Sequence, residues 1–317
     1  MIKVLFIDSN HPFLHEELIR KGFHCDLFWN KPKDELINLI PEYDCLVIRS
    51  KFKITAELID KAVKLKCIAR AGAGMENIDL DYAQQKGIFC VHAPEGNRDA
   101  VGEHAVAMLL NLFNNINRAD IEVRSGKWNR ESNRGIELKG KTVGIIGYGN
   151  MGSSFAQCLK GFSCKIIAYD KYKSGFGNEF VSEVSLQELQ ENADVISIHT
   201  PLTDETHYLL NNDFFNSLKK PVYIINTARG KCLNTAHLVE QIKSDKILGA
   251  CLDVLEYESV SFEQINNSDL PEPLIYLISS DKVILTPHIA GWTHESNLKI
   301  AQVLAEKICS VFNLNLN

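Results

Sequence analysis

Polar side chains that could do chemistry follow directly on several short apolar runs of this 317-residue chain. Each run has the length and composition of a buried strand, and the ligands of parallel sheets bind at the carboxyl ends of the strands. The polar clusters are His199-Thr200-Pro201, Asn226 to Gly230, Asp253 with Glu256 and Glu258, and Pro287 to Gly291. Together they supply an arginine (Arg229), a histidine (His288) and several carboxylates.

An arginine, a histidine and a carboxylate together suit hydride transfer at a carbon that bears a hydroxyl group. A histidine titrates near neutral pH and can accept the hydroxyl proton. A carboxylate beside it favours its protonated form and fixes its tautomer. An arginine can hold a substrate carboxylate through two parallel hydrogen bonds. The hydride requires a cofactor, because the protein supplies position and charge rather than redox chemistry.

A glycine-rich segment, KTVGIIGYGNMG from Lys141 to Gly152, predicts a dinucleotide site. Gly147 permits a tight turn from a strand into a helix, and Gly149 lets the backbone approach a pyrophosphate. Gly152 lets that helix pack closely against the strand. The first N–H groups of the helix are unpaired and favour a bound phosphate.

The residues after the glycines complete this motif. We predict a helix over 153–162 and a second buried strand over 165–169, which ends at Asp170. A carboxylate about 20 residues past the glycines accepts the ribose hydroxyls of the adenosine and repels a 2′-phosphate. The predicted cofactor is therefore NAD rather than NADP.

Strand and helix patterns alternate along most of the chain, which predicts parallel sheets with helices on their faces. In the first part we expect strands at 3–7, 25–28, 43–48, 65–70 and 87–91, and helices at 12–21, 32–40 and 55–63. After the glycine motif we expect strands at 195–199, 222–225, 248–254 and 283–285, and helices at 213–218, 235–243 and from 294 onward. A helix over 97–117 is apolar nearly all round at its centre, so it should be buried in the fold or against a partner subunit. Residues 259–280 should form a long loop or short helices.

Composition excludes several classes of protein. The net charge of −6 disfavours binding to nucleic acid or to an anionic membrane. The chain contains no run of 18 apolar residues, so no membrane span is predicted. The N-terminus lacks the pattern of a signal peptide. The nine cysteines form no CxxC pair and no zinc-binding spacing. We therefore expect a cytoplasmic protein with reduced thiols and no metal site.

Several motifs closely resemble those of the D-isomer-specific 2-hydroxyacid dehydrogenases. They are NTARG, LDVLEYE, TPHIAG, RAGAGMENID and the glycine-rich segment, in the order typical of that family. The resemblance covers nearly the whole chain and is strongest to the short 3-phosphoglycerate dehydrogenase-like members. It implies an NAD-dependent enzyme that acts on a small D-2-hydroxy acid or 2-oxo acid. Among these substrates 3-phosphoglycerate is preferred, because Arg49, Lys51 and Arg134 could bind a phosphate.

The resemblance also implies an architecture. It is an α/β protein with two doubly wound parallel-sheet domains, in which a Rossmann cofactor domain (98–290) is inserted into a flavodoxin-like substrate domain (1–97 and 291–317). The helix that follows Asn97 would help to form a homodimer. The regulatory domain of longer phosphoglycerate dehydrogenases is not expected here.

The family's site residues carry over to matching positions of this sequence. Arg229 would anchor the substrate carboxylate and His288 would act as acid and base, with Glu258 as its carboxylate partner in preference to Glu256. The implied cofactor-binding residues are Gly147, Tyr148, Gly149, Asn150, Met151, Gly152, Asp170, Thr200, Pro201, Thr227, Ala228, Asp253 and Gly291. The implied substrate-binding residues are Arg49, Ser50, Ala73 and Gly74, and a substrate phosphate could reach Arg49, Lys51 or Arg134.

Two departures from the family pattern and two other functions remain open at this point. Ser259 stands where relatives usually have proline, and the segment 259–280 is longer than usual. An NADH-sensing corepressor can have the same fold. An additional peptide-binding cleft and a disordered tail would favour that function. Formate dehydrogenases resemble this chain with glutamine in place of the glutamate, so the acid at Glu258 argues against them.

Overall fold

The computed structural model describes residues 1–29, 31–258 and 270–313, and Ser259 with the first part of the long segment lies outside this description. The chain divides into two compact units. The first comprises Met1–Arg98 and the residues from Trp292 onward, and the second comprises Asp99–Gly291. Each division falls one residue from the boundary expected from the sequence.

The first unit contains a five-stranded parallel sheet with strand order β2-β1-β3-β4-β5, the order of flavodoxin-like folds. Its strands are β1 (Lys3–Phe6), β2 (His24–Leu27), β3 (Cys45–Ile48), β4 (Cys67–Arg70) and β5 (Phe89–His92). Its helices are α1 (Pro12–Arg20), α2 (Lys33–Leu39), α3 (Ala56–Lys61), α4 (Leu80–Gln85) and α12 (His294–Val311).

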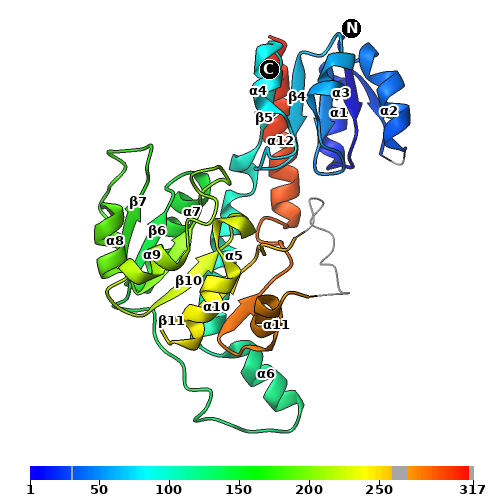
Figure 1. Ribbon diagram of the computed structural model, residues 1–317. Helices are drawn as coiled ribbons and strands as arrows, with labels where there is room; N and C mark the ends of the chain where they lie inside the picture. The colour runs from blue at the N-terminus through cyan, green and yellow to red at the C-terminus, as the bar shows by residue number, and fades with distance from the viewer. Residues whose placement is uncertain (30, 259–269, 314–317) are drawn as a thin grey trace. The chain divides into compact units, whose positions relative to one another are not determined.

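Helices cover both faces of this sheet. One apolar cluster joins the strands to α2, α3 and α4 through residues such as Leu36 and Leu58. The other joins them to Leu14 of α1 and to Leu304 and Ile308 of α12. Figure 1 shows α12, in red, beside β4 and β5. The last helix of the chain therefore belongs to the unit that contains its first strand.

The second unit contains a seven-stranded parallel sheet with strand order β8-β7-β6-β9-β10-β11-β12. Its strands are β6 (Thr142–Ile146), β7 (Lys165–Tyr169), β8 (Val181–Glu183), β9 (Val195–Ile198), β10 (Val222–Asn226), β11 (Ile247–Leu252) and β12 (Val283–Leu285). Its helices are α5 (Arg98–Phe113), α6 (Ile116–Arg124), α7 (Asn150–Leu159), α8 (Leu186–Asn192), α9 (Asn212–Ser217), α10 (Thr235–Lys243) and α11 (Glu272–Ser279). From β6 the chain adds strands in one direction as far as β8, and from β9 it adds strands in the other direction. A doubly wound sheet binds its ligand at this change of direction, between β6 and β9. The predicted fold class is confirmed.

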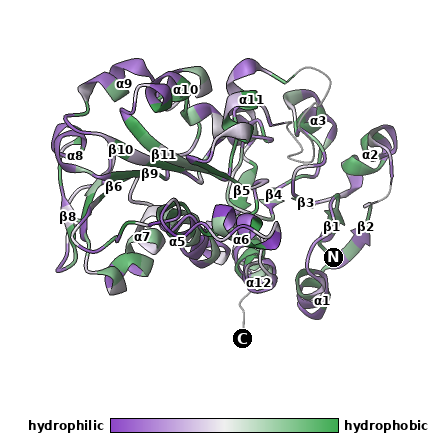
Figure 2. Ribbon diagram, turned by 90° about the horizontal axis from the view of Figure 1, so that it is seen from below, coloured by the Kyte–Doolittle hydropathy of each residue, from purple (hydrophilic) through white to green (hydrophobic). Residues whose placement is uncertain are grey.

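The strands of this second sheet are among the most apolar parts of the chain, because both faces of the sheet are covered (Figure 2). Helices α8, α9 and α10 pack on one face through residues such as Leu189, Phe215 and Leu238. Helices α5 and α7 pack on the other face through residues such as Leu109 and Phe155. The apolar centre of α5 is thus buried within its own unit.

Three local predictions differ from the structure. The helix expected over 97–117 ends at Phe113, because Asn115 adopts a left-handed conformation (φ +52°) that asparagine tolerates, and α6 begins after it. The helix expected from Ser153 begins at Asn150, directly after Gly149. Strand β8 and helices α4 and α8 are not individually predicted, although Ser185 and Glu188 form a capping box at the start of α8.

Candidate active site

The glycine turn between β6 and α7 has the conformation that a dinucleotide requires. Gly147 has φ +89°, which favours glycine. A Cβ atom at Gly152 would lie 2.1 Å from the carbonyl oxygen of Gly147, so the helix packs directly on the turn. A Cβ at Gly149 would meet no atom within 4 Å, and no side chain caps the start of α7 there. Asn150 and Met151 form the first turn of that helix, so its N–H groups suit a pyrophosphate.

Asp170 lies beside this turn at the end of β7. One carboxylate oxygen accepts a hydrogen bond from the backbone N–H of Tyr148 (2.8 Å). The other oxygen accepts from the N–H groups of Tyr172 (2.9 Å) and Lys173 (3.0 Å). These bonds fix the acid next to the glycine turn, where the adenosine ribose of a dinucleotide would lie.

Two buried polar atoms in the turns after β9 and β10 have no hydrogen-bond partner in the described part of the chain. They are Oγ1 of Thr227 and Nδ1 of His199, whose Nε2 pairs with the hydroxyl of Ser197 at 2.8 Å. Burial lowers the pKa of His199 to about 3, so this ring is neutral. Unsatisfied buried polar atoms call for an explanation. A cofactor bound at this edge of the sheet would supply partners, which fits the glycine turn beside it.

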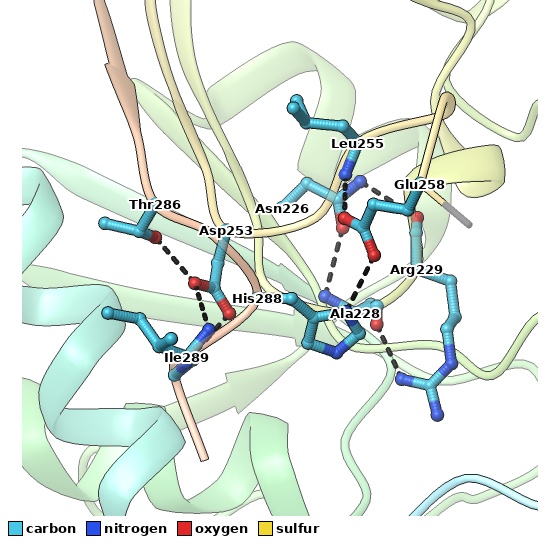
Figure 3. Close-up of polar contacts among 10 residues, drawn as sticks. Asn226, Ala228, Arg229, Asp253, Leu255, Glu258, Thr286, His288 and Ile289 are labelled. Atoms are coloured by element: carbon cyan, nitrogen blue, oxygen red, sulfur yellow. Dashed lines mark hydrogen bonds and ion pairs between the residues drawn. The ribbon is translucent and has the colours of Figure 1, made fainter. Parts of the chain in front are cut away.

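His288 and Glu258 form a hydrogen-bonded pair (Figure 3). Nδ1 of His288 lies 2.8 Å from a carboxylate oxygen of Glu258, and both side chains are half-buried or more. The other carboxylate oxygen of Glu258 accepts from the backbone N–H of Leu255. His288 has φ +56°, and its N–H donates to the carbonyl of Asp253 at 2.7 Å. The imidazole is therefore oriented by its backbone and by the carboxylate together.

Asp253 holds the turn that carries His288. Its buried carboxylate accepts from the hydroxyl of Thr286 (2.6 Å) and from the N–H groups of Ile289 (2.8 Å) and Ala290 (2.9 Å). Nε2 of His104 on α5 lies 3.1 Å from the same hydroxyl. The sequence predicts that Asp253 binds the cofactor and does not predict these contacts with the turn of His288. The sequence signal that could have predicted these contacts is an acid directly after a fully buried strand, because a buried charge needs hydrogen-bond donors.

Arg229 lies in the turn after β10. Asn226 shapes this turn, because its side chain accepts from the N–H of Ala228 (3.0 Å) and donates to the carbonyl of Arg229 (3.0 Å). The guanidinium of Arg229 donates to the carbonyl of Ala228 at 2.7 Å. In Figure 3 the side chains of Arg229 and His288 extend on the same side of the turns that carry them.

The other acid of this region, Glu256, does not contact His288. It accepts a hydrogen bond from the hydroxyl of Tyr208 and another from the N–H of Thr235 (3.0 Å). The structure thus pairs His288 with Glu258, the residue that the resemblance favours.

The remaining residues expected in the site divide between the two units. In the second unit, Thr200 and Pro201 follow β9, and Gly291 ends the turn of His288. In the first unit, Arg49 and Ser50 follow β3, and Ala73 and Gly74 follow β4. The guanidinium of Arg49 stacks over the ring of Trp292, 4.6 Å from its centroid. The ammonium of Lys51 donates to the carbonyls of Trp29 and Lys31, and exposed Arg134 pairs with Glu131 at 2.8 Å. Lys51 is therefore occupied in holding its neighbouring loop.

Three features define a dinucleotide-binding protein of the Rossmann class. They are a parallel sheet whose strand order changes direction, a glycine turn at that point, and an acid at the end of the next strand. The comparisons with known proteins agree. A sequence model described as "D-isomer specific 2-hydroxyacid dehydrogenase, NAD binding domain" matches residues 106–290. The chain belongs to the D-isomer specific 2-hydroxyacid dehydrogenase family, and its second unit is an NAD-binding domain.

Individual relatives carry several enzyme names. The chain is 38% identical to a D-3-phosphoglycerate dehydrogenase of Archaeoglobus fulgidus over 98% of its own length and 57% of the relative. It is 40% identical to a hydroxypyruvate reductase of Thermotoga maritima over 87% of each chain. Among solved structures, a D-lactate dehydrogenase from Aquifex aeolicus complexed with NAD and lactic acid aligns with a TM-score of 0.83 and 30% identity over 98% of this chain and 95% of that one. The chain spans little more than half of the length of the Archaeoglobus relative.

The described residues contain no group of histidine, cysteine and acidic side chains arranged to hold a metal ion. None of their helices combines the length and apolar character needed to cross a membrane.

Proposed function

We propose that this protein is an NAD-dependent dehydrogenase that interconverts a small D-2-hydroxy acid and its 2-oxo acid. The observation that carries the proposal is the 2.8 Å hydrogen bond between His288 and Glu258, beside Arg229 at the edge of the NAD-binding sheet. Family membership supports it, since relatives bear the names of phosphoglycerate, hydroxypyruvate and glyoxylate enzymes.

Each of the three side chains has a distinct role in this proposal. Arg229 binds the substrate carboxylate through its planar guanidinium and orients the carbon that reacts. Because Nδ1 of His288 faces Glu258, proton exchange with the substrate oxygen goes through Nε2. Glu258 stabilises the positive imidazolium that exists before the proton is donated or after it is accepted.

The cofactor site is formed by the glycine turn, Asp170 and the turn that contains Thr227. The residues from Gly147 to Gly152 would hold the pyrophosphate, and Asp170 would hold the adenosine ribose. The unpartnered hydroxyl of Thr227 would face the nicotinamide half. When bound, the nicotinamide supplies or accepts the hydride.

For the substrate we propose 3-phosphoglycerate and its 2-oxo product. The similarity to phosphoglycerate dehydrogenases supports this choice, and so does Arg49, a cation in the first unit that is held in place by its contact with Trp292. The first unit would then be the substrate domain. We further propose that the protein is a cytoplasmic homodimer.

The test is an assay of NADH oxidation with glyoxylate, pyruvate, hydroxypyruvate and 3-phosphohydroxypyruvate. We expect turnover with at least one of them, and silence with all four would refute the proposal. Glu258→Gln should lower kcat by about 100-fold, because the imidazolium loses its charged partner. A matched change, Glu240→Gln on the exposed side of α10, should leave kcat unchanged.

The choice of substrate has its own test. Arg49→Ala should raise KM about tenfold for 3-phosphohydroxypyruvate, which loses a charge-assisted contact to its phosphate. The KM for glyoxylate, which has no phosphate, should stay the same. Equal KM values for the phosphorylated substrate in the two proteins would rule out Arg49 as a phosphate ligand.

A further inference from the structure

Glu256 is a second acid in the turn from Leu255 to Glu258, and the proposed chemistry does not use it. One of its carboxylate oxygens accepts from the hydroxyl of Tyr208, and the other accepts from the N–H of Thr235 at 3.0 Å. Thr235 is the first residue of α10, so the negative charge lies at the positive end of that helix. Both oxygens of Glu256 are therefore bound to fixed donors.

Tyr208 adopts a backbone conformation that is uncommon for an aromatic residue. Its φ is +52°, in the left-handed region that residues with a Cβ atom rarely adopt. The backbone N–H of Tyr208 donates to the carbonyl of Lys231 at 2.8 Å. Lys231 lies in the turn that follows Arg229. In this conformation Tyr208 therefore connects the turn of Arg229, through its backbone, to Glu256, through its hydroxyl.

These two turns also pack directly against each other. A Cβ atom at Gly230 would lie 2.0 Å from the carbonyl oxygen of Leu255 and 2.6 Å from the backbone nitrogen of Glu256. Glu258 is then held at both carboxylate oxygens, by the N–H of Leu255 and by His288. A shift of Glu256 would move the Leu255 peptide, and with it the carboxylate of Glu258.

We propose that Tyr208 and Glu256 form a clamp of positioning residues. The clamp fixes the turn of Arg229 to the turn of Glu258 and so holds Glu258 against His288. Neither residue touches the substrate in this scheme, since they act through Arg229 and Glu258. The inference rests on the proposed function, because it assigns the clamp a part in the catalysis by those side chains. The hydrogen bond to Glu256, with a smaller effect of burial, raises the pKa of Tyr208 to about 12, so the hydroxyl keeps its donor proton at neutral pH.

The first experiment compares two tyrosines that donate to carboxylates. Tyr208→Phe removes the hydroxyl of the clamp, whereas Tyr82→Phe removes the hydroxyl that donates to Asp60 (2.7 Å) in the first unit. We expect Tyr208→Phe to lower kcat by about tenfold, because small misplacements of catalytic groups are costly. The Kd for NADH, measured by fluorescence, should not change, and Tyr82→Phe should not alter kcat. Equal kcat values for the two variants would overturn the proposal.

Variants of the acid separate positioning from simple loss of stability. Glu256→Gln keeps an acceptor oxygen for Tyr208, whereas Glu256→Ala keeps none. We therefore expect the glutamine variant to retain more of kcat than the alanine variant, at a temperature where both are folded. The same kcat in both variants, or a loss of NADH affinity that parallels the loss of kcat, would contradict the clamp.

A third measurement does not need turnover. In protein with ¹⁵N-labelled histidine, the Nδ1 proton of His288 should give a downfield NMR signal while Glu258 accepts it, and Glu258→Gln assigns that signal. We expect Tyr208→Phe to broaden or shift the signal and Tyr82→Phe to leave it unchanged. An unaltered signal in Tyr208→Phe would overturn the clamp. Absence of turnover by the unmodified protein would instead refute the proposed function.

Discussion

Backbone groups fix the acidic side chains around His288. Glu258 is bound by the N–H of Leu255, and Asp253 is bound by the N–H groups of Ile289 and Ala290. Such donors cost little entropy to hold in place, because the backbone of a packed turn is already ordered. An acid bound in this way keeps its position when the substrate enters, which is what proton transfer through His288 requires.

Replacement of Arg229 by lysine tests whether the planar guanidinium, and not only its charge, is needed. Lysine keeps the positive charge but cannot form two parallel hydrogen bonds to a carboxylate. We expect Arg229→Lys to raise the KM of the 2-oxo acid by about 10- to 100-fold, which corresponds to one lost charge-assisted hydrogen bond. Steady-state kinetics measure this effect. Arg20→Lys, at an exposed ion pair with Glu17, is the control and should behave like the unmodified protein.

The buried ring of His199 makes stability depend on pH. Burial lowers its pKa in the folded protein to about 3, below the ordinary value near 6.5, so the unfolded chain binds the proton more tightly. The folded state should therefore lose about 1 kcal/mol between pH 7.5 and pH 5.5 through this group. Urea unfolding at both pH values measures the loss, which should be smaller by that amount in His199→Asn. An identical pH dependence in both proteins would contradict this account.

The residues of the site differ in how well the sequence predicts them. Arg229 and His288 stand in short motifs at strand ends, so their residue types and positions suffice. The choice between Glu256 and Glu258 depends on the resemblance, because both acids follow the same strand and only Tyr257 separates them. Spacing alone does not tell which acid turns toward a histidine and which toward a helix N-terminus. Tyr208 carries no signal, since its φ depends on contacts with Lys231 and Glu256.

At the scale of elements, the close approach of two turns at Gly230 determines the geometry of the site. Gly230→Ala would place a Cβ atom 2.0 Å from the carbonyl oxygen of Leu255, and backbone atoms cannot move aside cheaply. We expect a loss of about 1–3 kcal/mol in unfolding free energy, as for other overpacked sites. The turns would also separate, so kcat should fall in the protein that remains folded.

The control for this prediction is Gly161→Ala. A Cβ atom at Gly161 would meet nothing within 4 Å, so this change should alter neither stability nor kcat. Chemical unfolding and kinetics of both variants make the comparison. Equal stability of the two variants would show that the turns tolerate separation.

Among elements, the helices and strands with strong apolar periodicity are predicted well and their ends less well. Helix α5 was expected to continue to residue 117, since Asn114 and Asn115 are too weak a signal to end a helix. The left-handed conformation of Asn115 is stabilised by the fold around it, including the hydrogen bond from Ile136 to Phe113. Strand β8 lies at the edge of its sheet and has one partner, so its sequence needs less apolar character.

At the scale of the whole molecule, alternating patterns predict the fold class because both parallel sheets are covered on two faces. Their strands therefore read as short apolar runs, separated by amphipathic helices. The passage of the chain from the first unit to the second and back is not visible in such patterns. It followed from the resemblance, and physically it depends on α12, whose apolar side chains complete the core around Leu14 and Leu18.

The last prediction concerns the assembly of two chains. Helix α5 buries its apolar side chains in its own unit, but α6 and the residues after it expose several large ones, including Ile121 (66% exposed) and Trp128 (77% exposed). Several large apolar side chains exposed within one segment of the chain favour a surface that binds a partner. We therefore expect the protein to be a dimer through this surface, and Ile121→Glu to shift it toward the monomer, because a charge would be buried. Light scattering after size-exclusion chromatography measures the mass of each. Ile19→Glu, at an isolated exposed isoleucine on α1, should remain dimeric, whereas a monomeric unmodified protein would contradict the prediction.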